Sequence, residues 1–195
     1  MRFSLTILIT ILLFSCNTEK KKSISIAKEG HSVTEKVLDT IKFTNGYDFP
    51  VGKPNAVNYY NAQKFQENLH LGDDWNGKGG GNTDLGDPIY AIANGYVSLA
   101  EDYKGGWGNI IRIIHYNPDA TKVESLYAHC KDIFVKKGDY ITKGTKIGSI
   151  GTADGAYLAH LHLEIRDNIG LPIGPGYSAE TEGYLNPTDY INKHR

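Results

Sequence analysis

The sequence is poor in cysteine and has no excess of either charge, and both absences narrow the classes of protein to consider. Only two cysteines occur in 195 residues, so a disulfide-rich scaffold is excluded. The formal net charge is -1 and the pI is near 6.6, which leaves no surplus of Lys and Arg to bind phosphates. We therefore expect no nucleic-acid partner.

Long hydrophobic runs are missing everywhere except near the N-terminus. Residues 3–14 form an apolar stretch after a single arginine, and Cys16 follows it closely. A membrane-spanning helix needs about 20 apolar residues, whereas this chain becomes strongly polar from Asn17 onward. We predict that residues 1–15 are a signal peptide.

The end of this segment, Leu-Phe-Ser-Cys, resembles a bacterial lipoprotein box, in which the cysteine is acylated and becomes the first mature residue. The resemblance implies a lipid anchor at Cys16 in the bacterial cell envelope, with the protein facing the periplasm or the cell exterior. Residues 16–45 mix charged, small polar and isolated apolar residues without a regular period, which is typical of a tether. We expect a lipid-anchored tether over 16–45 and one folded domain over 46–195.

The rest of the chain favours strands and tight turns over helices. It is rich in glycine (22) and tyrosine (13) and contains a single methionine. We predict a mainly β fold, a single domain of antiparallel β-sheet with few short helices. The expected strands lie at 89–93, 96–100, 110–115, 123–129, 146–150 and 158–165. The expected helices lie at 56–65 and after the N-cap Asn186, with Pro187 in the first turn.

Two of the seven histidines lie in the segment AHLHLEIR. Strand alternation places His160, His162, Glu164 and Arg166 on one face and the aliphatic residues on the other. Two imidazoles that face the same space favour a metal or catalytic site over a random polar face. The alternation does not decide which histidine binds a metal. Glu164 is expected either to orient one imidazole or to form an exposed ion pair with Arg166.

Two other segments supply further candidates. In HLGDDW, His70 and Asp74 are four residues apart and together could bind zinc through nitrogen and oxygen. In SLYAHC, alternation predicts that His129 shares a face with Tyr127, while Cys130 points to the opposite side. We expect Cys130 to be a packed small hydrophobic residue rather than a ligand or nucleophile.

The remaining histidines and the Gly-rich segment 76–82 carry weaker signals. His115 ends an apolar strand and is expected to be a hydrogen-bonded structural residue, while His31 and His194 are expected at the solvent. The Gly-rich segment lacks the spacing of a phosphate-binding loop. We expect it to be a flexible connection beside the site.

Taken in order, the motifs of this chain resemble those of the lysostaphin-type (LytM-like) zinc endopeptidases, which cleave peptide bridges in bacterial peptidoglycan. The matching segments are HLGDDW, GDPIYAIANGYV, YAH, KKGDYITKGTKIGSIG and HLHLEIR, over about residues 70–166. The resemblance implies a mostly antiparallel β fold with a narrow, loop-walled groove and one zinc ion (Zn2+) per chain. The implied zinc ligands are His70, Asp74 and His162, and the implied catalytic pair is His129 and His160.

The resemblance therefore implies a zinc-dependent endopeptidase that hydrolyses peptide crosslinks of peptidoglycan with metal-activated water. Its partners would be peptidoglycan stem peptides or bridges, and a membrane through the anchor at Cys16. The alternative is a non-catalytic cell-wall binding module, because some members of the family have lost their ligands and instead activate amidases. All five site positions are filled in this chain, which favours an enzyme.

Overall fold

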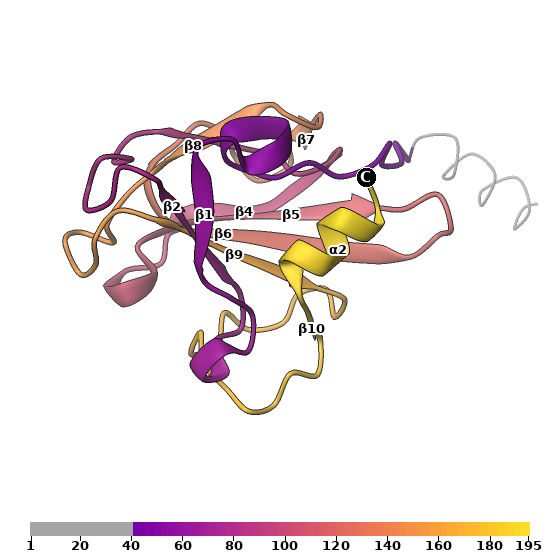
Figure 1. The fold of residues 1–195 in the computed structure, drawn as a ribbon. Helices are drawn as coiled ribbons and strands as arrows, with labels where there is room; N and C mark the ends of the chain where they lie inside the picture. The colour runs from indigo at the N-terminus through magenta and orange to yellow at the C-terminus, as the bar shows by residue number, and fades with distance from the viewer. Residues whose placement is uncertain (1–40) are drawn as a thin grey trace, which may run out of the picture. The chain divides into compact units, whose positions relative to one another are not determined.

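Ten strands form one antiparallel sheet in the computed structural model, which describes residues 41–195 (Figure 1). The strands are β1 (Tyr59–Gln63), β2 (Asp73–Gly77), β3 (Pro88–Tyr90), β4 (Gly95–Asp102), β5 (Asn109–Tyr116), β6 (Lys122–Ile133), β7 (Tyr140–Ile141), β8 (Lys146–Ile150), β9 (Leu161–Arg166) and β10 (Tyr184–Leu185). The main path runs β1-β2-β9-β6-β5-β4-β7, while β10 pairs with β9, and β8 pairs with both β3 and β6. The predicted mainly β, antiparallel fold is confirmed.

Some sequence predictions fall outside the described range. The predicted signal peptide, Cys16, His31 and most of the tether precede residue 41. Among residues 41–195, no helix is both long and apolar enough to cross a membrane.

Helical structure in the described region is short, as expected. The helical segments are η1 (Gly52–Ala56), η2 (Glu67–Leu69), η3 (Gly105–Trp107) and α2 (Pro187–Lys193). The predicted C-terminal helix is confirmed, because the side chain of Asn186 accepts a hydrogen bond from the backbone N–H of Asp189 at 3.1 Å. The helix expected over 56–65 is wrong.

The reason for that error lies in the backbone on either side of residue 57. Ala56 and Asn58 have φ values of 55° and 68°, which a right-handed helix does not allow. The chain then enters β1, in which half-buried and exposed side chains alternate and which pairs with β2. Two consecutive tyrosines suit such a half-buried edge strand.

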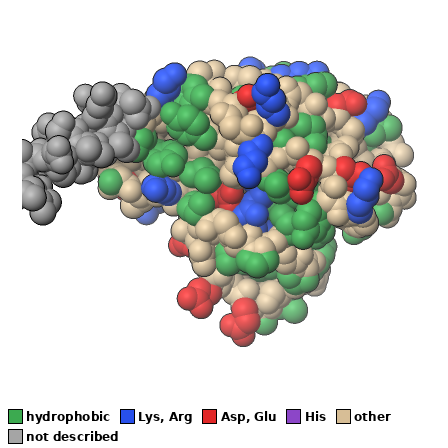
Figure 2. Space-filling model, turned by 180° about the vertical axis from the view of Figure 1, so that it is seen from behind, with side chains coloured by type: hydrophobic (Ala, Val, Ile, Leu, Met, Phe, Trp, Pro, Cys, Tyr) green, Lys and Arg blue, Asp and Glu red, His purple; other side chains and the backbone are tan. Residues whose placement is uncertain are grey.

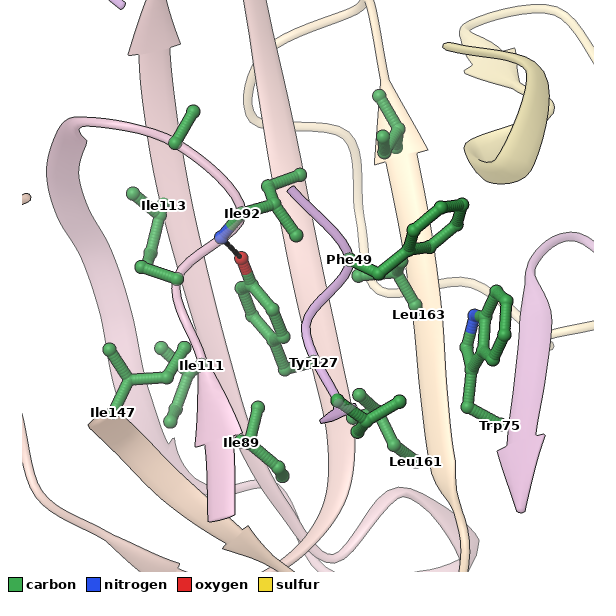
Figure 3. Packing of buried hydrophobic residues seen from close by; sticks show 14 of the residues in the cluster. Phe49, Trp75, Ile89, Ile92, Ile111, Ile113, Tyr127, Ile147, Leu161 and Leu163 are labelled. Atoms are coloured by element: carbon green, nitrogen blue, oxygen red, sulfur yellow. Dashed lines mark hydrogen bonds between the residues drawn. The ribbon is translucent and has the colours of Figure 1, made fainter. Parts of the chain in front are cut away.

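The main hydrophobic core lies on one face of the central strands (Figure 3). From β9, Leu161, Leu163 and Ile165 all point into it, as the predicted alternation requires. Each is fully buried, and such burial contributes about 1.5–3 kcal/mol per aliphatic side chain. The alternate residues of β9 therefore face the opposite side of the sheet, where the candidate site lies.

His115 is a structural residue within this fold, which confirms its predicted role. Its ring is completely buried, with Nδ1 2.9 Å from the backbone oxygen of Asn94 and Nε2 2.8 Å from Oγ of Ser125. A carbonyl oxygen can only accept, so Nδ1 donates and Nε2 accepts from the Ser125 hydroxyl. Cys130 is likewise buried in the core, as predicted.

The buried carboxylate of Asp73, at the start of β2, forms hydrogen bonds with two other segments of the chain. Asp73 accepts a hydrogen bond from the backbone N–H of Phe65 at 3.0 Å through one oxygen. Its other oxygen accepts from the backbone N–H and the hydroxyl of Thr188, at 3.0 and 2.6 Å. Asp73 thereby ties α2 and the end of the β1 region to the residue that precedes Asp74.

Candidate metal centre and groove

His70, Asp74 and His162 converge on one point at the junction of β2 and β9. Asp74 lies directly opposite His162 in the β2–β9 pairing, and the segment before β2 carries His70. Nδ1 of His162 is 2.9 Å from Nε2 of His70 and 3.0 Å from Oδ1 of Asp74, and the third separation, from Nε2 of His70 to Oδ1 of Asp74, is 3.4 Å. The three predicted ligands are thus brought together, with both histidines buried.

A glycine makes this approach possible. A Cβ on Gly72 would lie 2.5 Å from the backbone oxygen of Leu163 and 2.9 Å from Cε1 of His162. Neither the backbone nor the packed ring could give way without moving the cluster. Gly72 therefore allows the chain between His70 and Asp74 to lie directly against β9.

The donor set fits a zinc ion. Nδ1 of His162 offers either one N–H or one lone pair, so it cannot form full hydrogen bonds with His70 and Asp74 at the same time. A cation among the three atoms would satisfy all of them. Ligand atoms bound to tetrahedral zinc at about 2.0–2.2 Å lie roughly 3.3–3.6 Å apart, and the observed separations approach this spacing.

The electrostatics of the cluster favour positive charge. Burial tends to lower the pKa of His162, but hydrogen bonds to Asp74 and Glu164 outweigh it and raise the pKa to about 9. Burial tends to raise the pKa of Asp74, but hydrogen bonds with His162 and His70 outweigh it, so this pKa lies well below its usual range. Two carboxylates thus flank one imidazole at a place where a metal cation would be stabilised.

A buried series of hydrogen-bonded side chains holds the ring of His162 on the side opposite the candidate metal position. Nε2 of His162 is 3.2 Å from Oε1 of Glu164, whose other oxygen accepts a hydrogen bond from Nε of Arg166 at 2.6 Å. Arg166 also donates to the backbone oxygens of residues 171–173, at 3.3, 3.0 and 2.7 Å. Glu164 and Arg166 are completely buried, so the exposed ion pair is wrong and the alternative that Glu164 orients an imidazole is favoured.

His129 and His160 lie beside the three-residue cluster. Their ring centroids are 4.7 Å apart, and the His129 ring is 5.6 Å from that of His162. Nδ1 of His160 lies 2.8 Å from the backbone oxygen of Leu158 and must donate, which leaves the Nε2 lone pair free, 3.8 Å from Oδ1 of Asp74. The predicted pair is therefore assembled next to the candidate ligands.

A break in the alternation of β6 places His129 in the site. His129 has a φ of 59°, in the left-handed region, and the β6 pairing shifts register immediately after it. Tyr127 and Cys130 both belong to the main core, whereas His129 faces the groove. The expectation that His129 shares a face with Tyr127 is wrong, because the left-handed residue reverses the side of the strand to which His129 points.

Burial leaves His129 uncharged at neutral pH. Burial, together with the neighbouring His162 and His160, lowers the pKa of the ring to about 3. Nδ1 of His129 is also buried without a hydrogen-bond partner in the described structure. The ring is thus a neutral imidazole with an unused nitrogen beside the groove.

These residues line a cavity of about 470 Å³ that has aromatic walls. The further lining residues are Gln63, Gly106, Trp107, Tyr157, Pro175, Gly176 and Tyr177. Trp107 and Tyr157 lie against His129, and Tyr177 lies against His70. These three aromatic residues were not predicted as part of the site, although each lies one or two residues after a glycine in a loop.

The Gly-rich segment lies beside the cavity but is not among its lining residues. Asn82 accepts a hydrogen bond from the backbone N–H of Ala159 at 2.8 Å, and Asn76 donates to the backbone oxygen of Ala159 at 3.3 Å. Ala159 immediately precedes His160. The segment over 76–82 thus lies beside the site as predicted, and its two ends hold the residue next to His160.

The chain is similar in sequence to several known proteins. The chain is 40% identical over 81 residues to Lipoprotein NlpD of Yersinia enterocolitica, covering 42% of this chain and 78% of that protein. Murein hydrolase activator NlpD of Escherichia coli is 37% identical, covering 42% of this chain and 20% of its own length. Peptidoglycan DD-endopeptidase ShyA of Vibrio cholerae is 32% identical, covering 42% and 18%. This chain therefore spans less than a third of the last two relatives.

Solved structures agree on the fold. Lysostaphin from Staphylococcus simulans superposes with a TM-score of 0.50 at 25% identity, covering 69% of this chain and 48% of that one. The SpoIIQ–SpoIIIAH complex gives a TM-score of 0.57 at 19% identity, covering 76% and 92%, a likeness of fold alone. Residues 74–175, more than half of the chain, match the model of peptidase family M23, and that range includes Asp74 and the three histidines 129, 160 and 162. The chain belongs to peptidase family M23.

Proposed function

We propose that this protein is a zinc-dependent endopeptidase that hydrolyses peptide crosslinks of bacterial peptidoglycan. The observation that carries the proposal is the convergence of His70, Asp74 and His162 at a cavity that also contains two further imidazoles. Membership of family M23 and the similarity to the peptidoglycan endopeptidase ShyA and to the peptidase lysostaphin support a peptidase that acts on the cell wall. The groove accepts an extended peptide beside the candidate metal centre.

Each residue of the site has a distinct task in this proposal. His70, Asp74 and His162 would hold one zinc ion, which when bound supplies a Lewis acid for the scissile carbonyl and for water. His160 accepts the proton of the attacking water, because its Nδ1–H is already committed to Leu158 and its Nε2 lone pair is free. Neutral His129 donates a hydrogen bond to the oxygen that becomes negatively charged.

We further propose that residues 1–15 are removed, that Cys16 carries a lipid anchor and that the segment predicted as a tether, residues 16–45, joins the domain to a membrane. The last residues of this segment pack on the domain, because the backbone N–H of Thr44 donates to the oxygen of Tyr116 at 2.8 Å. The names of the relatives NlpD and YgeR, both called lipoproteins, support this assignment. The protein would then act in the bacterial cell envelope, facing the periplasm or the cell exterior.

The first experiment separates metal binding from turnover. His162→Ala should abolish both bound zinc and cleavage of purified peptidoglycan, whereas His129→Ala should keep the zinc and lose most of the turnover. Elemental analysis measures the metal, and mass spectrometry of the digested peptidoglycan identifies new peptide termini. Normal turnover in both variants would overturn the role assignments.

The second experiment distinguishes the enzyme from an amidase activator, the alternative function; the Escherichia coli relative is named a murein hydrolase activator. An endopeptidase produces new peptide termini without a partner, stops when zinc is chelated and recovers when zinc is returned. An activator releases no peptide termini by itself and still stimulates an amidase when His129 and His160 are replaced. That second pattern would refute the proposal.

A further inference from the structure

Lysines and aromatic rings cover one side of the domain, away from the groove. Two segments build it, residues 41–57 and residues 134–146, and we call it the lysine–aromatic face. Each of three lysine ammonium groups lies over a ring, which keeps the charge at the surface and the ring partly exposed. The pairs are Lys42 over Tyr140 at 4.2 Å, Lys53 over Tyr90 at 4.1 Å and Lys146 over Phe134 at 4.8 Å.

The two segments contact each other and carry an excess of positive charge. Nζ of Lys53 donates to the backbone oxygen of Gly144 at 2.6 Å, and Nζ of Lys143 donates to that of Asn45 at 3.4 Å. Together the segments contain six lysines and two aspartates, in a described domain whose acidic residues outnumber its basic ones. The lysines are Lys42, Lys53, Lys136, Lys137, Lys143 and Lys146, and the aspartates are Asp48 and Asp139.

This face and the groove lie on opposite sides of the domain. Figure 1 places β7 and β8 along the upper edge, while η2, η3 and the loop before β10, which flank or line the groove, lie on the lower side. Figure 2 shows lysine and arginine side chains among hydrophobic ones over the upper part of one view, with some acidic side chains between them, and acidic side chains at the lower tip. The excess of lysine in the two segments therefore lies on the side of the domain opposite the groove.

Exposed apolar rings accompany the positive charge. Phe43 is 38% exposed and Phe134 is 52% exposed, although both are large hydrophobic residues. Lysines alone would suit any polyanion, but lysines combined with exposed rings match the interface of an anionic bilayer, where rings enter the headgroup region and ammonium groups meet phosphates. Lys42 and Phe43 are also near the first described residue, so any anchor that precedes them is joined to the domain at this face.

We infer that the lysine–aromatic face docks the domain on the anionic surface of the membrane and points the groove away from it. The inference rests on the proposed anchor at Cys16, which would hold the domain at high local concentration beside the lipid. The anionic surface attracts this face more strongly than the rest of the described domain, where acidic residues outnumber basic ones, and this difference fixes the orientation. The groove then opens toward material that lies beyond the membrane surface.

Lysine footprinting of the full chain in vesicles tests the docking. The protein, purified with its N-terminal anchor, is reconstituted in phosphatidylcholine vesicles with or without 30% phosphatidylglycerol and acetylated briefly. We expect Lys42, Lys137 and Lys146 to be protected only in the anionic vesicles, with protection lost at high salt. Lys64 and Lys104, exposed near η2 and η3, should react equally in both and serve as internal controls.

Two matched triple variants measure how much the lysines contribute to docking on the membrane. Each lysine near an anionic surface contributes about a fivefold preference, so Lys42→Gln, Lys137→Gln and Lys146→Gln together should lower the ratio of docked to undocked protein by about 100-fold. The control combines Lys64→Gln, Lys78→Gln and Lys104→Gln, which changes the charge equally elsewhere and should not weaken docking. Circular dichroism checks that both variants fold.

Three results would overturn the inference. Equal labelling of the face in neutral and anionic vesicles would exclude docking, as would equal loss in the two triple variants. Protection by a soluble anionic wall polymer but not by vesicles would assign the face to that polymer instead. The mass spectra that locate the acetylated lysines also give the mass of the peptide that contains Cys16, so a missing lipid counts against the proposed anchor alone. Peptidoglycan cleavage is not measured in this experiment, so its result does not depend on the proposed enzymatic activity.

Discussion

Replacing Glu164 by glutamine should weaken metal binding without touching a ligand. The carboxylate of Glu164 accepts from His162 on one side and from Arg166 on the other, and all three residues are at most 3% exposed. Glutamine keeps the shape but removes the charge that orients the His162 ring. Loss of such a supporting group typically costs 10–100-fold in metal affinity, or about 1.4–2.7 kcal/mol.

The same substitution should also lower the free energy of unfolding of the metal-free protein. It leaves the guanidinium of Arg166 buried without a counterion, which costs about 3–5 kcal/mol in other proteins. Three backbone oxygens of residues 171–173 continue to accept from Arg166, so we expect a loss near the lower value. A lower free energy of unfolding in Glu164→Gln would therefore not by itself prove that Glu164 supports metal binding.

Glu124→Gln is the matched control. Glu124 is also almost completely buried, pairs with Arg112 and accepts a hydrogen bond from the hydroxyl of Ser98 at 2.6 Å, but within the described region it forms no hydrogen bond or ion pair with the candidate ligands. Urea denaturation should show comparable losses for both variants, whereas competition with a chromophoric zinc chelator should show weaker binding for Glu164→Gln only. Equal zinc affinity in the wild type and Glu164→Gln would refute the supporting role of Glu164. Equally weakened zinc binding in Glu164→Gln and Glu124→Gln would show that the loss comes from general destabilisation of the fold.

Two further predictions test the fold around the site. Burial lowers the pKa of His115 to about 4, so its contribution to stability is complete above pH 6.5 and is lost as the pH falls toward 4, by about 3 kcal/mol in all. Urea titrations at pH 7 and pH 4 should show a smaller acid-induced loss in His115→Gln than in the wild type, and equal losses would contradict this reasoning. Gly72→Ala should weaken zinc binding at least tenfold, because the added Cβ meets the ring of His162 and the backbone of Leu163. Chelator competition measures this, and unchanged affinity would show that the chain can relax around the methyl group.

Strand alternation predicted the part of the site that lies on regular structure. In β9 the period of two places Leu161 and Leu163 in the core and His162 and Glu164 on the other face, and the structure has this arrangement. Nothing in the alternation could show that β2 would pair with β9 so that Asp74 lies opposite His162, because that pairing joins segments far apart in the chain. Only the ordered set of motifs predicted that these residues meet.

The failures of sequence reasoning occur where the backbone leaves the common conformations. His129 is left-handed within a strand, and Ala56 and Asn58 are left-handed before β1. These residues give no sequence signal for a positive φ comparable to glycine, so neither the reversed side chain nor the interrupted helix could be anticipated. The surrounding sheet holds them in place, and in the case of His129 the unusual conformation delivers a side chain to the groove.

Arg166 connects the chemistry of the site to the shape of its groove. Through Glu164 it fixes His162, and through three carbonyl oxygens it fixes residues 171–173, which lead directly into the cavity wall formed by residues 175–177. The backbone N–H of Leu71, next to His70, then donates to the oxygen of Gly176 at 2.9 Å and closes a ring of contacts around the cluster. A displacement of the wall must therefore strain the support of a candidate ligand. The wall of the groove and the centre that would hold the metal are consequently connected by direct contacts through His162, Glu164 and Arg166, which are alternate residues of β9.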